Sequence, residues 1–388
     1  MFKRFLALTL TLVGTSAHAD EVILRAAQVY TMTGAPLAPG AVRVKDGKIA
    51  EVAAAIDAPA GMKVIDLGSG VLLPGLVDAC DTLAIEGGAA EATREVTPNI
   101  RVIDAVDWSA RALRAARSEG ITTVALIPGT DNVIAGLSCI VKTAGAPAKR
   151  IIRKDHALVI TEASDPASGN ASRNRPDSIY NRQPTNRMGV TWMLRSEFGR
   201  ARTTVAGNDN KANLTTAVRE ALDGKRPVVC VSRIDSDILS ALRLQKEYSL
   251  HLIIAGGQEA YRVKDVLAAA KVPVLLGKLS TTAGGGPEGS ETILNSAGLL
   301  HEAGVPFALT GGQLFDQIRF AKRHGLPADA ALAAVTSVPA KLLGIEDRVG
   351  TIAAGRDADL VALSGDPFDL TTAIRWTMTD GVIRTEEQ

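Results

Sequence analysis

Cysteine is scarce in this 388-residue chain, and neither sign of charge is in excess. The three cysteines, Cys80, Cys139 and Cys230, are too few for a disulfide scaffold or a four-cysteine zinc site. Lys and Arg number 43 against 42 Asp and Glu, so no overall field attracts nucleic acid or anionic lipid. With 46% hydrophobic and 22% charged residues, the chain is predicted to be globular, with a large core and no nucleic-acid partner.

Long apolar runs are also missing, because no stretch reaches the roughly 20 residues of a membrane-spanning helix. Residues 1–19 combine Lys3 and Arg4, the apolar run Phe5–Val13 and the small-residue stretch 17–19, which is typical of a secretory signal peptide. A membrane anchor is the alternative, and the short apolar run argues against it. We therefore expect an exported protein, periplasmic or secreted, with no membrane contact after cleavage. Its three cysteines would permit at most one internal disulfide.

Short apolar strands alternate with amphipathic helical stretches between residues 74 and 344. This alternation predicts an α/β fold, with a parallel sheet and helices outside it. The length of about 270 residues fits a closed (β/α)8 TIM-like barrel. An open doubly wound sheet is the alternative, but no strand leads into a G-x-G-x-x-G turn.

Both chain ends carry short β-branched segments separated by turn residues such as Asp46-Gly47 and Asp380-Gly381. We predict that residues 20–73 and 345–388 together form a small β-sandwich beside a barrel of residues 74–344. The polar stretch 163–186 is either a functional lid or a disordered loop.

Two motifs flank the predicted barrel, PGLVDA at 74–79 and GRDADLVAL at 355–363. With GITTVALIPGTDNVIAG at 120–136 and VTSVPAKLLGIEDRVGTIAAG at 335–355, they give a chain that resembles the amidohydrolase superfamily, and most of all the group related to imidazolonepropionase. The resemblance implies hydrolysis of carbon–nitrogen bonds in a small, often cyclic, amide. It also implies a divalent metal such as zinc at the strand C-termini, which activates water, and an Asp that moves protons.

The metal ligands implied by the resemblance are a His-x-His pair after PGLVD, one His on each of two later strands, and an Asp near the end of the barrel. Those positions hold Cys80, Thr82, Arg233, Gly256 and Gly312, or Gly311 with a shift of one residue. A guanidinium repels a cation, and glycine offers no side-chain ligand. None of the four histidines beyond the signal segment stands at a predicted strand C-terminus. We therefore predict that the metal centre is lost and that no metal cofactor is bound.

A relocated zinc site built from Asp78, Cys80, Asp81 and Cys230 is the alternative to this loss. Against it, strand alternation predicts that Cys230 is a small buried hydrophobe facing a helix. No G-x-S-x-G motif supports a serine nucleophile. Lys142 would act as a base only if burial lowered its pKa, and otherwise it is an exposed cation.

Two functions follow. The first is a non-catalytic barrel that binds a small ligand or pairs as a subunit, as a homodimer or with an intact amidohydrolase relative. Its candidate ligand-binding residues are Arg233 and Thr82, since a guanidinium holds a carboxylate well, although Arg233 could instead pair with Asp235 or Asp237. The second is a hydrolase of carbon–nitrogen bonds in a small cyclic amide, metal-free or with a relocated metal, with Cys80, Asp81 and Lys142 as weak catalytic candidates.

Overall fold

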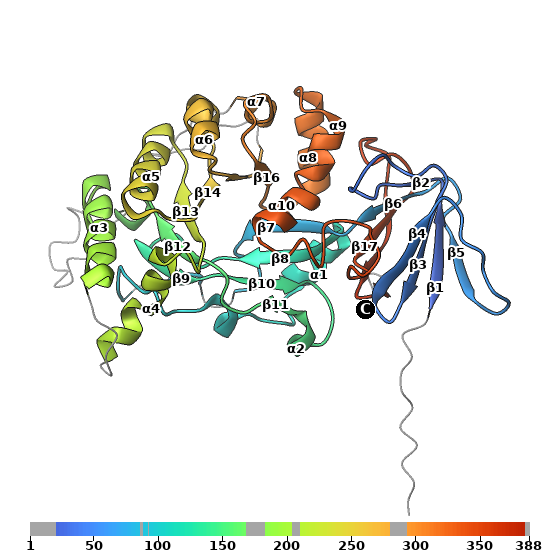
Figure 1. The fold of residues 1–388 in the computed structure, drawn as a ribbon, viewed down its shortest axis with the longest axis horizontal. Coiled ribbons are helices and arrows are strands. Elements are labelled where there is room, and N and C mark those ends of the chain that lie inside the picture. The colour runs from blue at the N-terminus through green and yellow to red at the C-terminus, as the bar shows by residue number, and fades with distance from the viewer. Residues whose placement is uncertain are drawn as a thin grey trace, which may run out of the picture.

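The computed structural model describes residues 21–384 except 86–87, 92, 168–182, 204–209 and 280–292. The predicted signal segment 1–19 and most of the polar stretch 163–186 lie outside the described residues. In Figure 1, sheets from both chain ends lie at one end of the molecule, beside a larger region of strands and helices. No helix in the described ranges has both the length and the apolar character needed to cross a membrane.

Strands from both ends of the chain form two sheets. The first has the order β4-β3-β1-β5, and its members are β1 Val22–Ala26, β3 Gly40–Lys45, β4 Lys48–Ala53 and β5 Lys63–Asp66. The second has the order β19-β18-β17-β6-β2, with β2 Gln28–Val29, β6 Val71–Pro74, β17 Leu360–Leu363, β18 Ile374–Thr379 and β19 Val382–Arg384. Asp46 and Gly47 join β3 to β4 with φ values of 50° and 75°, so the predicted hairpin turn is confirmed.

The two sheets share one apolar cluster. Leu24 and Val42 contribute to it from the first sheet, and Leu72, Leu360 and Met378 from the second. Alternate residues of β1 and β3, such as Leu24 and Val42, face this cluster, whereas Ile23 and Ala41 are buried in a second, smaller one. Residues separated by more than 300 positions in the sequence are thereby buried together.

The region between these ends is a TIM-barrel-like α/β arrangement. Its strands are β7 Leu76–Asp81, β8 Ile121–Leu126, β9 Ile134–Leu137, β10 Cys139–Lys142, β11 Ile151–Arg153, β12 Leu158–Thr161, β13 Val228–Ser232, β14 Leu252–Gly256, β15 Val274–Leu276 and β16 Phe307–Leu309. Its helices are α1 Arg111–Ser118, α2 Pro147–Arg150, α3 Arg187–Thr203, α4 Asn210–Leu222, α5 Asp235–Tyr248, α6 Lys264–Ala270, α7 Ser296–Glu302, α8 Leu314–Arg323, α9 Ala328–Ala333 and α10 Ser337–Leu342. Three 3-10 turns complete it, at Val102–Ala105, Asp165–Ala167 and Ala260–Val263.

Strand pairing in the described residues does not close the barrel that the sequence predicts. The pairing gives one sheet β11-β10-β8-β7 and another β16-β15-β14-β13-β12-β9. The two sheets meet where β9 continues into β10. In the first sheet β10 is antiparallel to β8, and in the second β9 is antiparallel to β12. Between β16 and β7 the ladder is interrupted, and the carbonyls of Ala334 and Val335 accept hydrogen bonds from Leu309 N and Val77 N. This linker separates α9 from α10.

Alternate strand residues face two different cores. One set, which includes Ala79, Val159, Val231, Ala255 and Ala308, packs in a cluster enclosed by the strands. The other set packs in a larger cluster with the helices around the strands. This period of two fixes which side chains point into the barrel-like interior.

Candidate functional site

The carboxylate of Asp78 is enclosed by backbone donors at the end of the barrel-like region where the family's chemistry would occur. Asp78 lies on β7, is fully buried, and accepts hydrogen bonds from Gly312 N at 2.8 Å and Gly311 N at 3.1 Å. Cys80 N adds a third donor, at 3.2 Å. Gly311 and Gly312 have φ values of 90° and 73°, a backbone conformation that favours glycine, and it lets both amides point at one carboxylate.

Burial sets the protonation of the groups around Asp78. Burial and then the nearby charge of Asp81 raise the pKa of Asp78 to about 7, although the backbone donors act in the opposite direction. Burial, followed by the charges of Asp78 and Asp81, raises the pKa of the Cys80 thiol far above its ordinary value. The Cys80 thiol therefore stays protonated at neutral pH, and a thiol is a much weaker nucleophile than a thiolate.

The raised pKa of Asp78 predicts a pH dependence of stability. A carboxyl whose folded-state pKa is about 7 stabilises the fold most below its unfolded pKa of about 3.9, and this contribution is lost as the pH rises through 7. Denaturation in urea from roughly pH 5 to pH 8 should show a smaller loss of unfolding free energy in Asp78→Asn than in the wild type. Asp359 and His156 also titrate in or near this range but contribute to both proteins, so equal slopes would contradict the assignment.

Asp81 and Thr82 form the turn that ends β7. The Asp81 carboxylate accepts hydrogen bonds from Thr82 N at 2.6 Å and Leu83 N at 2.9 Å, so it caps its own loop. The Thr82 side chain is exposed. The structure thus places Cys80, Asp81 and Gly312 around Asp78 and leaves Thr82 at the surface of the same loop.

Arg233 and Gly256 form a second group, on neighbouring strands. Arg233 follows β13, and its Cγ would lie 3.3 Å from a Cβ added at Gly256, the last residue of β14. The guanidinium pairs with Asp165 and not with Asp235 or Asp237, the partners that the sequence offered as an alternative to ligand binding. Asp237 instead accepts from Arg187 Nε at 2.8 Å. In the sheet order, β15 and β16 stand between this group and Asp78.

Cys230 does not belong to either group. Its side chain is fully buried in the cluster formed with the surrounding helices, which include Ile238 and Ala241 of α5. Strand alternation turns it away from the interior, where its neighbours Val229 and Val231 pack. The relocated zinc set that needs Cys230 with Cys80 is therefore not assembled. The structure records all three cysteines as free thiols.

Lys142 lies beside Asp357 and Asp359, a location that the sequence did not suggest. Because β10 runs antiparallel to β8 and pairs Lys142 with Thr123, its last residue lies toward the start of β8, away from Cys80 and Arg233. Lys142 is fully buried, with its Nζ 2.8 Å from Asp357 and 3.1 Å from Asp359, and it also pairs with Asp380. The interpretation as an exposed cation is wrong, and so is a role beside Cys80.

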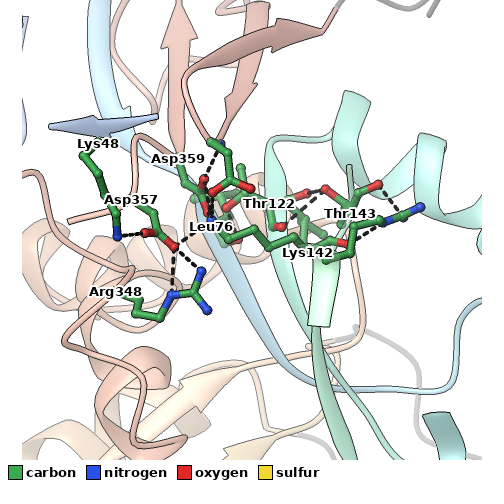
Figure 2. Close-up of polar contacts among 11 residues, drawn as sticks. Lys48, Leu76, Thr122, Lys142, Thr143, Arg348, Asp357 and Asp359 are labelled. Carbon is green, nitrogen blue, oxygen red and sulfur yellow. Dashed lines mark hydrogen bonds and ion pairs between the residues drawn. The ribbon is translucent and has the colours of Figure 1, made fainter. Parts of the chain in front are cut away.

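Figure 2 shows Lys142 beside Asp357 and Asp359. Burial alone would lower the pKa of Lys142, but the carboxylates of Asp359, Asp380 and Asp357 outweigh burial, raise this pKa and keep the lysine protonated. Asp357 is also bound by Lys48 and by Arg348, whose Nη2 lies 2.7 Å away. Lys142 first, and then Lys48 and Arg348, overcome the effect of burial and lower the pKa of Asp357 to about 2. A lysine with a raised pKa is a poor general base, so Lys142 here holds the barrel-like region to the C-terminal strands.

The five positions of the implied metal centre do not fit a divalent cation. They provide a protonated thiol at Cys80, an exposed hydroxyl at Thr82, an ion-paired guanidinium at Arg233, and two glycines. The Asp78 carboxylate is already hydrogen-bonded by three backbone amides. Within the described ranges, no three His, Cys, Asp or Glu side chains are grouped as metal ligands. No reaction step through a metal is therefore derived for these residues.

Comparison with known proteins relates the sequence and the fold of this chain to one superfamily. A sequence profile described as "Amidohydrolase family" matches residues 304–384. The "Amidohydrolase tasK" of Hapsidospora irregularis is 26% identical over 358 residues, covering 81% of this chain and 35% of the relative. An amidohydrolase crystal structure from Thermotoga maritima MSB8 matches with a TM-score of 0.85 and 28% identity, over 93% of this chain and 99% of the other. The chain belongs to the amidohydrolase superfamily.

The superfamily assignment confirms the resemblance at that level. A zinc-bound adenosine deaminase from Xanthomonas campestris, with a TM-score of 0.57 and 16% identity over 94% of this chain and 92% of its own, shares the fold. This chain spans about a third of the length of the curated relative from Hapsidospora irregularis. The narrower resemblance to the imidazolonepropionase group stays a prediction.

Sequence reasoning placed Asp78 only in the relocated zinc set and missed its contact with Gly311 and Gly312. The signal available was the pair Gly311-Gly312 directly after a strand, at the position where the family has its Asp. Two consecutive glycines allow a positive-φ turn whose amides converge on an anion. A carboxylate on the neighbouring first strand was the natural partner for these amides.

Proposed function

We propose that this amidohydrolase-superfamily protein has lost the hydrolytic metal centre and binds a small molecule at the C-terminal end of its strands without cleaving it. The observation that carries the proposal is the donor set at Cys80, Thr82, Arg233, Gly256 and Gly312, which contains no imidazole and no carboxylate. Arg233 supports the ligand role because its side chain remains 25% exposed. A ligand carboxylate would replace Asp165 as the partner of this guanidinium.

The proposal predicts that purified protein carries substoichiometric zinc. Elemental analysis of protein prepared without chelators measures this directly, and we expect no carbon–nitrogen hydrolase activity that a chelator abolishes. Cys80→Ala is the matched control, because it removes the only sulfur ligand near Asp78 among the described residues. One zinc per chain in the wild type that disappears in Cys80→Ala would overturn the proposal.

The second candidate function is a metal-free hydrolase acting on a carbon–nitrogen bond of a small cyclic amide. The observation favouring it is Asp78, whose pKa of about 7 suits a carboxyl that exchanges protons near neutral pH. Chelator-resistant hydrolysis of a cyclic amide that Asp78→Asn abolishes and Cys80→Ala preserves would support it. Activity unchanged by Asp78→Asn would remove this candidate.

The finer architecture and setting are also proposals. The shared apolar cluster supports a small β-sandwich of residues 20–73 and 345–388 beside a (β/α)8 barrel of residues 74–344. Export through a signal peptide at residues 1–19 rests on the sequence alone, as does pairing with a second copy or an intact relative. Mass analysis of secreted protein for a new N-terminus at residue 20 tests the export proposal.

A further inference from the structure

A cavity of about 660 Å³ lined by arginines lies outside the region of Asp78 and Arg233. One wall comes from α1 and another from the β18–β19 hairpin. The hydroxyl of Thr377 on β18 donates to the carbonyl of Arg117 on α1 at 2.9 Å and fixes the two walls to each other. Arg117 is one turn before β8 begins, so the cavity is toward the end of the barrel-like region opposite Cys80 and Asp81.

Five arginine side chains line the cavity, from α1 and from the β18–β19 hairpin. Arg111, Arg114 and Arg117 recur every third residue of α1, which places them on neighbouring parts of one helix surface. Arg384 stands directly opposite Thr377 in the antiparallel pair, and Arg375 precedes Thr377 on β18, where the pairing of β18 with β17 is irregular. The arginines therefore converge from two elements that are distant in sequence.

No acid in the described part of the chain forms an ion pair with these arginines, although the charge of Asp107 acts on Arg114. None of the five takes part in an ion pair there, although Arg114 donates to the Ser109 carbonyl and Arg375 to the Leu67 carbonyl. Arg117 is only 8% exposed. The Nε atom of Arg384 is buried without a hydrogen-bond partner among the described residues.

Among the described residues, this arrangement leaves positive charge without an ion-paired acid. Burial lowers the pKa of Arg117, and the positive charges of Arg384 and Arg114 lower it further. Buried cations without partners are unfavourable, so an anion entering the cavity would gain desolvated, charge-assisted hydrogen bonds. The volume lies in the usual range of small-molecule sites, and Trp376 adds an aromatic wall.

We propose that this arginine cavity binds a small phosphate-bearing anion. Guanidinium groups match two oxygens of one phosphate, and five of them from two walls suit a ligand with more than one negative charge. The site is independent of the proposed ligand at Arg233, because it shares no residue with it.

Isothermal titration of the full protein with inorganic pyrophosphate, in a buffer free of phosphate, tests the proposal. We expect saturable binding of one pyrophosphate per chain, and a Kd raised about tenfold or more by Arg117→Gln, since a hydrogen bond to a charged group contributes about 1.5–3 kcal/mol. Because Arg117 is buried, the exposed pair Arg111→Met with Arg375→Met gives a second variant that leaves the core intact. It should also weaken binding about tenfold or more.

Arg323→Met is the matched control, because it removes one exposed positive charge at the end of α8 and should leave the Kd unchanged. Absence of saturable binding to the wild type would overturn the proposal. An equal loss of affinity in Arg323→Met and Arg117→Gln would also overturn it, since it would indicate a general charge effect. Tighter binding of citrate than of pyrophosphate would overturn the assignment to the phosphate class.

Discussion

Lys142→Met should lower the free energy of unfolding by about 3–5 kcal/mol, the usual cost of removing one partner from a buried ion pair. Methionine fills a similar volume, so the loss reports charge and hydrogen bonding more than a cavity. The variant would leave Asp357, Asp359 and Asp380 grouped without the ammonium that now contacts all three. Urea denaturation followed by circular dichroism measures the difference.

Lys48→Met is the matched control for this prediction. Lys48 pairs with the same Asp357, but its side chain is 52% exposed, so water compensates for much of its loss. We expect a change below about 1 kcal/mol, as for other exposed ion pairs. If the two variants were equally stable, the buried contacts of Lys142 would not be what stabilises the junction with the C-terminal strands.

Gly75→Ala should destabilise the protein by about 3 kcal/mol, at the upper end of the usual cost of overpacking a core. A Cβ at Gly75 would lie 2.2 Å from Thr122 Oγ1 and 2.8 Å from Thr122 Cβ. Thr122 is fully buried on β8, and the pairing of β8 with β7 holds it in place. The contact is with atoms close to the backbone, so a side-chain rotation does not relieve it.

Gly34→Ala provides the comparison for Gly75→Ala. Nothing lies within 4 Å of a Cβ added at Gly34, and its backbone is not in the left-handed region. Thermal and urea unfolding should therefore place Gly34→Ala within about 0.5 kcal/mol of the wild type. A similar loss in both variants would mean that the passage from β6 to β7 does not require glycine.

The sequence predicted the main elements because their signals are local. Strand alternation and turn residues identify β13, β14 and the hairpin at Asp46-Gly47, since each depends on neighbours a few residues away. The direction of β10 is not encoded in this way. Nothing in the segment containing Lys142 shows that it runs antiparallel between two other strands, and this error placed Lys142 at the wrong end.

The sequence predicted which metal ligands the site lacks, but it did not predict which residues contact one another there. Reading the family positions identified Arg233 and Gly256 as residues unsuited to zinc, because a guanidinium is a cation and glycine has no side-chain ligand. The partners of Asp78 and Arg233 depended on tertiary geometry. Asp165 lies 68 positions from Arg233, and Gly312 lies 234 positions from Asp78, so no local pattern pairs them.

The pairing of β6 with β17 determines when the sheet β19-β18-β17-β6-β2 can be completed during synthesis. Leu72 of β6 lies opposite Ala362 of β17, so this ladder joins segments made nearly 300 residues apart. Until the ribosome has released the last strands, β6 lacks its antiparallel neighbour and its apolar side chains have no cover from that side. A chain truncated before β17 should consequently aggregate or be degraded, even though nearly all of the barrel-like region is present in it.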